Sequence, residues 1–363
     1  MRDNALDALR MIAVLFMVMS HTTRLITWDE RRAWSVFSLL IEPMTASLFL
    51  VLVGASLTHS WLSARTRALG GALTEVEIKV AWFKRQALRA LPLWAVSCVF
   101  YALEDGPHLP DMLTMSGILA TIAYTILAGM LLVSARRPVP LLIAMAVMLS
   151  GLHTWLDLRG LRVFALNAGN SPLLPLFLFA CLGALGAYVL ESGGRRTRAL
   201  LAAAALLTVA GLIHRYGFAA LFSKPLGRYE TIRTLVTHPA GRMVERNIPY
   251  YNLRPILVPM IVSLTIMLYG GLALLRPVLD RIARWALPLG RRSLDVYILH
   301  LALLAVLVET GGKRPLKAAW QGDAVILMMA VLCYAWVTAR DRYPRFPLLW
   351  KTGNGTGEKD TSA

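Results

Sequence analysis

Long apolar segments recur along this 363-residue chain and constrain its fold more than any other feature. Hydrophobic residues make up 57% of the sequence, against about 45–50% in ordinary soluble domains. A helix of about 20 apolar residues crosses a bilayer, because it satisfies its backbone hydrogen bonds internally. We therefore expect an all-α fold, a polytopic transmembrane helical bundle of about ten spans. The expected spans are 8–28, 36–59, 82–103, 112–134, 139–156, 172–191, 198–216, 254–275, 291–310 and 322–340.

Lys and Arg residues flank these segments and predict their orientation. With the N-terminus inside, the cytoplasmic segments hold 23 of them and the outer loops hold 15, seven of which lie in one long loop at about 213–254. Positive residues concentrate on the cytoplasmic side, so both termini should be cytoplasmic. This placement also accounts for the net charge of +17 without nucleic acid. We expect a single domain over 1–350 and a disordered polar tail over 351–363.

The long outer loop combines aromatic and basic side chains. A connector of this length is usually functional or disordered. Its aromatic residues suit the binding of a sugar or glycolipid head group, but they fit equally well an interfacial re-entrant helix at the head-group level. The residues concerned are Tyr216, Phe218, Phe222, Tyr229, Tyr250 and Tyr251, with Arg228, Arg233, Arg242 and Arg246.

The first span carries two ionisable residues, Arg10 and His21. Eleven helical steps of 100° place them within about 20° of one face and about 16 Å apart. Ionisable residues within spans are costly and usually line functional cavities. Asp7, three residues before Arg10, can hold the guanidinium in place. The geometry suits group transfer across a membrane. A plainer interpretation is an interhelical hydrogen bond at His21 and an ion pair at the start of the helix.

Residues 11–19 resemble the apolar core of a signal peptide, but no small-x-small cleavage site follows them. We therefore expect a retained first span, which its polar residues should place inside the bundle. No second ligand lies at metal-binding spacing near His21, so we expect no metal. Cys98, Cys181 and Cys333 are far apart within apolar segments, and we expect buried, inert thiols.

Other charged residues are further candidates. Glu42 precedes a proline in the second span, where it could orient His21, bind substrate, or simply lie in water at the outer interface. Arg85 and Arg89 open the third span. They suit the phosphates of a nucleotide-like cofactor, although such residues also serve as inner-surface anchors.

A similar pattern recurs in LPLGRRSLDVYILH, residues 287–300. Arg291 and Arg292 begin this span and His300 lies within it, three residues after Tyr297 and on the same face. A second histidine within a span favours a polar cavity inside the bundle, but it does not identify a reaction.

These segments together resemble integral-membrane acyltransferases. The opening NALDALRMIAVLFMVMSH is similar to the first helix of acyltransferase 3-like proteins, whose pattern includes an arginine-x10-histidine spacing, met here by Arg10 and His21. The late RRSLDVYILH matches as well. The blocks TASLFLVLVGASLTHSW, WFKRQALRALPLW and SGILATIAYTILAGMLL look most like the heparan-α-glucosaminide N-acetyltransferase-like branch. The matches cover most of 4–134 and 254–310.

The resemblance implies a multi-pass protein of the bacterial inner membrane. It would move an acyl group, acetyl by default, from cytoplasmic acyl-CoA to an extracytoplasmic sugar, polysaccharide or glycolipid. Membrane lipids and a second copy of the chain are further expected partners. The resemblance makes His21 the base or acyl carrier, places Arg10 along the CoA path and has His300 lining the cavity. Glu42, chosen from its position in the second span, completes the candidate catalytic set. Acyl-CoA would lie near Arg85, Arg89, Arg291 and Arg292.

Two departures from the family pattern keep alternatives open. Met11 replaces the glycine that usually follows the arginine. The loop 23–36 has no histidine, so the acyl-histidine step of lysosomal members cannot be transferred onto it. One alternative is a transporter or flippase for a lipid-linked sugar, although the internal repeat expected of such a protein is not evident. Another is a catalytically degenerate subunit of an envelope-assembly machine.

Overall fold

A computed structural model describes most of the chain. The described residues are 4–22, 35–68, 74–104, 106–107, 109, 111–114, 117–161, 163, 166–167, 171–194, 197–199, 201–206, 229–237, 243–251, 257–310 and 319–342.

Ten apolar helices form the described part of the molecule, and they correspond one to one with the ten predicted spans. Six are long and apolar enough to cross a membrane, and four are shorter. The prediction of an all-α polytopic bundle is therefore confirmed. The six long helices are α1 (Asn4–Thr22), α3 (Ser35–Ala68), α4 (Glu75–Glu104), α7 (Pro138–Leu158), α8 (Leu173–Ser192) and α14 (Ala319–Arg342). The shorter ones are α6 (Ile118–Val133), Thr197–Leu206, α10 (Leu257–Leu274) and α13 (Ser293–Thr310).

Smaller elements connect these helices. A turn of helix, α5 (Asp111–Thr114), precedes α6, while α11 (Arg276–Ala286) and α12 (Pro288–Arg291) join α10 to α13. The long loop contains an antiparallel hairpin of β1 (Tyr229–Thr237) and β2 (Met243–Tyr251). The register pairs Tyr229 with Tyr251. The described part of this loop is therefore a hairpin and not the re-entrant helix considered from the sequence. Tyr216, Phe218, Phe222, Arg228 and Arg242 lie outside the described residues.

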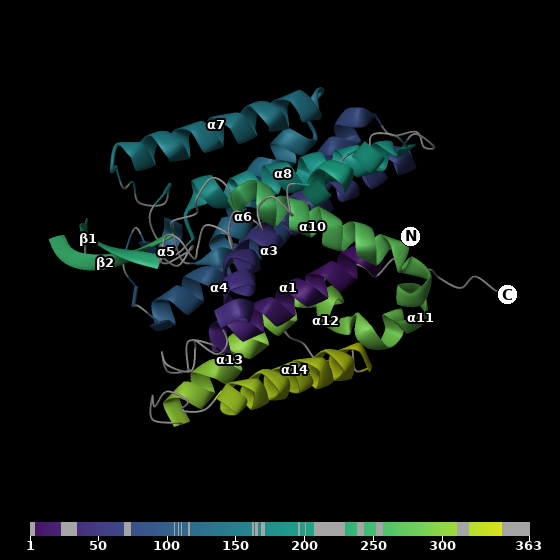
Figure 1. Cartoon of the computed structure of the whole chain (residues 1–363). Helices are drawn as coiled ribbons and strands as arrows, with labels where there is room; N and C mark the ends of the chain where they lie inside the picture. Colours follow the sequence, from purple (N-terminus) through teal and green to yellow (C-terminus); the bar gives the residue numbers. More distant parts are fainter. Residues whose placement is uncertain are drawn as a thin grey trace.

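The helix α1 lies at the centre of the bundle (Figure 1). It packs against α3 and α10 on one side and against α11, α12, α13 and α14 on the other. Val14 and Met17 on the second side are buried among side chains of α12, α13 and α14. The weak first span is thus enclosed by protein, as its polar residues predicted.

The helices α3 and α8 approach each other closely through glycine. A Cβ atom on Gly54 would lie 1.9 Å from the backbone oxygen of Ala180, and one on Gly183 would lie 2.1 Å from that of Val51. No side chain fits at either position, so the two backbones touch. The small residues of these spans therefore serve packing within one chain here.

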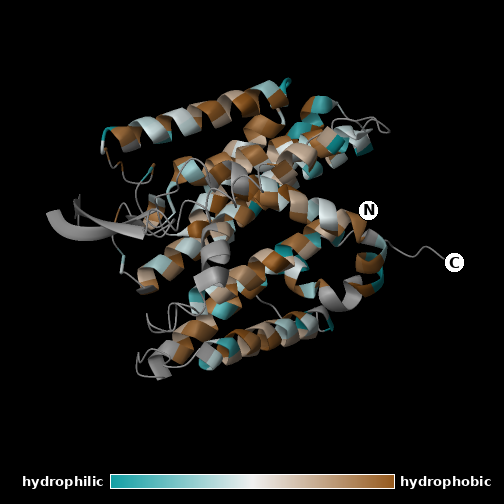
Figure 2. Cartoon of the chain, viewed as in Figure 1, coloured by the Kyte–Doolittle hydropathy of each residue, from teal (hydrophilic) through white to brown (hydrophobic). Residues whose placement is uncertain are grey.

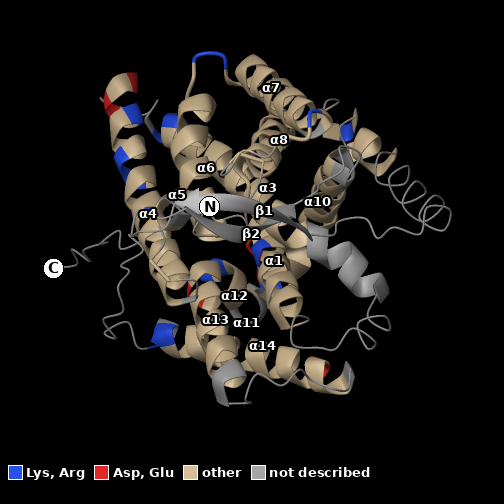
Figure 3. Cartoon of the chain, turned by 90° about the vertical axis from the view of Figure 1, so that its left-hand side faces the viewer, with Lys and Arg blue, Asp and Glu red and all other residues tan. Residues whose placement is uncertain are grey.

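The outward sides of the peripheral helices are apolar, as a lipid-facing surface requires. Figure 2 shows hydrophobic residues along α7 and α14, where Val147, Trp155, Leu327 and Val331 are exposed. Lys and Arg gather instead at helix ends and along α4 (Figure 3). The three cysteines are free and buried, as expected.

Candidate functional site

Two histidines from distant parts of the sequence meet within the bundle. His21 lies in the last turn of α1, and the fully buried His300 lies in α13. The Nδ1 atom of His21 is 2.8 Å from the Nε2 atom of His300. Their ring planes are within 11° of parallel, with centroids 5.1 Å apart. The structure thus joins two predicted site residues that the sequence could not pair.

The surroundings of His300 assign the protons of this pair. Its Nδ1 atom is 3.1 Å from the carbonyl oxygen of Val296, which can only accept a hydrogen bond. In a neutral His300, Nδ1 therefore carries the proton and Nε2 accepts one from Nδ1 of His21. A neutral His21 then has its lone pair on Nε2, as a general base requires. The ring of Tyr297 stands edge-on to His300 at 5.5 Å, as their shared helix face predicted.

A second cluster forms about 16–21 Å from His21 along α1 by helix rise, around the fully buried Asp7. Nη1 of Arg10 lies 2.6 Å from Oδ1 of Asp7, confirming the predicted pair, and Nη2 donates to Ser56 of α3 at 2.7 Å. Nε of Arg291 approaches Oδ2 of Asp7 at 3.6 Å, and its Nη2 donates to Asn4 at 3.3 Å. One carboxylate therefore bridges Arg10 and Arg291.

A glycine allows this close approach of α12 to α1. A Cβ atom on Gly290 would lie 1.9 Å from the backbone oxygen of Asp7 and 3.0 Å from the backbone nitrogen of Met11. Met11 itself packs beside Val14 and Met17 against α12, α13 and α14. The close backbone contact near Arg10 is thus made through Gly290 of α12. The glycine that usually follows the arginine in α1 is replaced by Met11 here.

The remaining predicted cations divide into two groups. Arg85 and Arg89 are exposed on α4, and Arg89 is close enough to Arg85 and Arg10 for their charges to repel. Arg292 instead lies 3.4 Å from Asp295, whose carboxylate also contacts Arg340 at 2.5 Å. Arg10, Arg85, Arg89 and Arg291 therefore form one basic region, while Arg292, next to Arg291, is paired with Asp295. The backbone of Glu42 lies in α3, but its side chain is outside the described residues.

The histidine pair and the Arg10 cluster are separated by packed apolar side chains. Val14 and Met17 lie between them on the same face of α1 and are buried. A cavity of about 450 Å³ lies on the neighbouring face, between α1, α3, α8 and α10. None of the predicted site residues lines it. The polar cavity expected around His21 and His300 is thus not the one found here.

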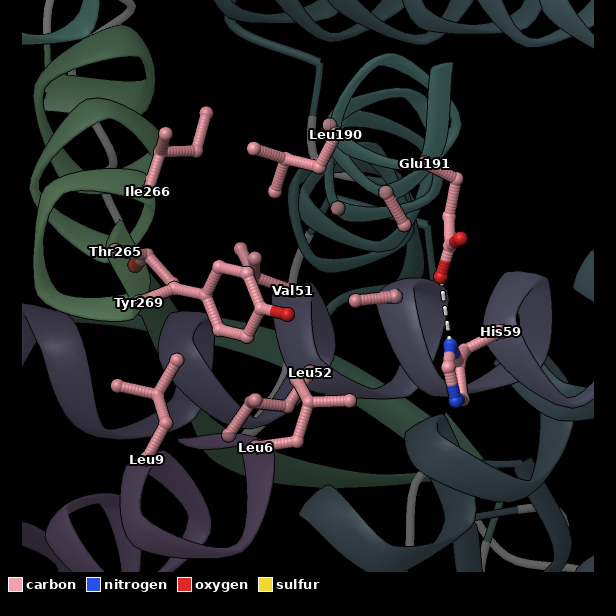
Figure 4. Close-up of a pocket in the computed structure, with 14 residues that line it drawn as sticks. Leu6, Leu9, Val51, Leu52, His59, Leu190, Glu191, Thr265, Ile266 and Tyr269 are labelled. Atoms are coloured by element: carbon pink, nitrogen blue, oxygen red, sulfur yellow. Dashed lines mark hydrogen bonds and ion pairs between the residues drawn. The ribbon is translucent and has the colours of Figure 1, made fainter. Parts of the chain in front are cut away.

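A further polar pair at this cavity was not singled out from the sequence. Nδ1 of His59 in α3 lies 2.8 Å from Oε1 of Glu191 at the end of α8 (Figure 4). The sequence feature that could have indicated this pair is His59 itself, a histidine at the end of the predicted span 36–59. Glu191 lies 132 residues further along the chain, at the end of the predicted span 172–191. A carboxylate at the end of a span would ordinarily face water, so the sequence did not pair the two residues.

Nearly the whole chain matches a known protein family. A family model described as an acyltransferase domain, of the acyltransferase 3 type, matches residues 3–340. The chain belongs to the acyltransferase 3 family. The match spans nearly all the helices above, from α1 to α14, so the acyltransferase is a multi-pass membrane protein. No curated protein matches it.

Family membership confirms the resemblance drawn from the sequence. Both helices that supply the histidine pair of the acyltransferase, α1 and α13, lie within the matched range, as does the Asp7 cluster. The similarity to the heparan-α-glucosaminide N-acetyltransferase-like branch stays a prediction.

Proposed function

We propose that this acyltransferase moves an acyl group, acetyl by default, from cytoplasmic acyl-CoA to an extracytoplasmic sugar, polysaccharide or glycolipid in a bacterial inner membrane. The observation that carries the proposal is the hydrogen bond between His21 and His300, which leaves a lone pair on Nε2 of His21. Arg10, on the same helix as His21, lies among the cations that suit the phosphates of the donor.

His21 acts as the base in the direct form of the reaction. Its Nε2 takes the proton from the hydroxyl or amine of the acceptor, whose oxygen or nitrogen attacks the thioester carbonyl. The C–S bond then breaks, and the CoA thiolate leaves and takes up a proton. In the alternative form, Nε2 itself attacks and carries the acyl group to the acceptor as an acyl-histidine. Both forms use the same atom of His21.

The basic region holds the charged end of the donor. Arg10, Arg85, Arg89 and Arg291 present forked donors for phosphate oxygens. The pantetheine arm then extends towards His21, over the helix rise of about 16 Å that separates Arg10 from His21. Because Val14 and Met17 are packed between the two clusters, the arm passes beside this face of α1 or displaces these side chains.

Acyl-CoA turnover by the purified protein in nanodiscs tests this proposal. We expect slow thioester hydrolysis, or transfer to an added sugar, in the wild type and its loss in His21→Ala, with CoA binding retained. Arg10→Ala should weaken CoA binding instead. His153→Ala, which alters a buried histidine of α7 remote from the pair, is the matched control.

Two results would count against the enzyme. If the wild type neither binds nor turns over acyl-CoA, the transporter becomes the better interpretation. If the wild type binds CoA without turning it over and His21→Ala leaves the cellular phenotype intact, His21 does not perform the chemistry and the degenerate subunit gains support.

A further inference from the structure

The cavity beside α1 has the form of a blind apolar pocket. Its walls on α3 run from Val51 to His59 and on α8 from Gly183 to Glu191. Eight residues of helix rise give a depth of about 12 Å. The backbone contact between Gly183 and Val51 closes the deep end. Figure 4 shows Leu6, Leu9, Leu190 and Ile266 around the ring of Tyr269, with His59 and Glu191 together at one end.

The two ends of the pocket differ sharply in polarity. The side chains of His59 and Glu191 are 38% and 48% exposed, so this end reaches solvent or the membrane surface. The body is lined mostly by leucine, valine, isoleucine, alanine and glycine, with Thr265 and Tyr269 on α10. A volume of about 450 Å³ is within the range of small-molecule sites, and apolar cavities of this kind bind apolar ligands in place of water.

Arginines lie near the open end. Ser56, which accepts a hydrogen bond from Arg10, lies one helical turn before His59 on the same face of α3. Arg65 is exposed in the last turns of α3. Glu191 is the one acidic residue among the lining residues, and it is paired with His59. Asp7, next to the lining residue Leu6, is shared by the two arginines Arg10 and Arg291. An anionic head group at this end would therefore meet more positive than negative charge.

We propose that this pocket binds a single acyl chain carried on an anionic head group, with the chain between α1, α3, α8 and α10 and the head beside His59 and Arg10. The ligand is a fatty acid or one chain of an anionic phospholipid, which share this chemistry. The site is separate from the His21–His300 pair and shares only Arg10 with the proposed donor site, and it does not rest on the proposed acyl transfer.

Chain length and head charge give the first test, with binding followed by native mass spectrometry on protein in nanodiscs. Affinity should rise about fourfold per methylene from hexanoate to octanoate, as for burial in an apolar site, and level off once a longer chain reaches the closed end. Decanoate should bind more tightly than decylamine, which has the same chain and the opposite charge. Equal or tighter binding of decylamine would overturn the anionic head group.

A pocket-filling substitution gives the second test. Gly186 lines the pocket, and a Cβ there would meet Ile266 only at 3.7 Å. Gly186→Leu should therefore occupy the pocket without a backbone clash and lower decanoate binding at least tenfold. Gly271→Leu is the matched control, because a Cβ at Gly271 has no atom within 4 Å and Gly271 is exposed outside the pocket. Equal binding by wild type and Gly186→Leu, or equal loss in both variants, would overturn the proposal.

The same variants identify the source of the chain. Tighter binding of dioctanoyl-phosphatidylglycerol than of decanoate, lost in Gly186→Leu, assigns the pocket to a membrane lipid. The reverse pattern assigns it to a free fatty acid. His21→Ala should leave either ligand bound as in the wild type, so that this site and the acyl-transfer site can fail independently.

Discussion

Asp7 is a fully buried carboxylate between two arginines, and its charge determines where both guanidinium groups lie. Asp7→Asn leaves Arg10 and Arg291 facing each other without a counter-charge. Removing one partner from a buried ion pair typically costs about 3–5 kcal/mol. We expect a large fall in the unfolding temperature in detergent and weaker binding of CoA, both measured on the purified variant.

Asp280→Asn separates this effect from the loss of any carboxylate near the start of α1. Asp280 is exposed and accepts a hydrogen bond from Asn4 at 2.7 Å. Interactions of exposed pairs contribute at most about 1 kcal/mol, so this variant should unfold close to the wild type. Equal unfolding temperatures for the two variants would show that Asp7 does not hold the cluster together.

His300 is a positioning residue for His21, and its two substitutions should differ. His300→Ala removes the acceptor for Nδ1 of His21 and so lowers kcat by about 10²–10⁴, the usual contribution of general base catalysis. KM for acyl-CoA should change little, because the basic region is elsewhere. His300→Gln supplies a carbonyl oxygen that can accept the same proton, so part of kcat should return. A change confined to KM would assign His300 to donor binding instead.

Helix geometry alone predicts contacts within one helix but not between helices. Asp7 and Arg10 are three residues apart, so their pairing followed from the sequence. His21 and His300 are 279 residues apart. Periodicity places each on a face of its own helix, whereas only the packing of α1 against α13 shows that these faces meet. The same limit hid the His59–Glu191 pair, whose partners lie on α3 and α8.

At the scale of helices, the close contact between α3 and α8 requires glycine at position 183 but not at position 186. A Cβ on Gly183 would lie 2.1 Å from the backbone oxygen of Val51, whereas one on Gly186 has its nearest neighbour at 3.7 Å. Gly183→Ala must separate the helices and should destabilise the protein by about 1–3 kcal/mol, as overpacking does. Gly186→Ala should be nearly neutral. Unfolding in denaturant measures both, and equal midpoints would contradict this packing.

The existence of the helices followed from hydropathy, but their ends did not. The prediction began the third span at residue 82, whereas α4 begins at Glu75. Thr74 and Glu77 explain the difference, because each side chain caps the other's backbone N–H. The helix α3 likewise continues to Ala68 instead of ending at 59. Hydropathy marks where a helix meets lipid, whereas capping and polar side chains determine where it stops.

At the scale of the whole molecule, the charged residues gather at one end of the bundle. Asn4 contacts Asp280 and Arg291, and Asp295 contacts Arg340. The start of α1, the connection α11–α12 and the end of α14 therefore lie together, while the hairpin lies at the opposite end (Figure 1). This arrangement agrees with the alternation of spans expected from the sequence. A donor bound by Arg10 and Arg291 must come from the side on which α1 begins.

The proposed direction of transfer therefore requires that α1 begins in the cytoplasm, and single cysteines test this. Leu109, in the connection between α4 and α6, is 45% exposed and should lie outside. Arg137, exposed between α6 and α7, should lie inside. An impermeant thiol reagent should label Leu109→Cys on intact cells, and Arg137→Cys only after permeabilisation. The native cysteines are buried and should stay unlabelled. The opposite labelling pattern would place Arg10 and Arg291 on the outer side, where cytoplasmic acyl-CoA cannot reach them.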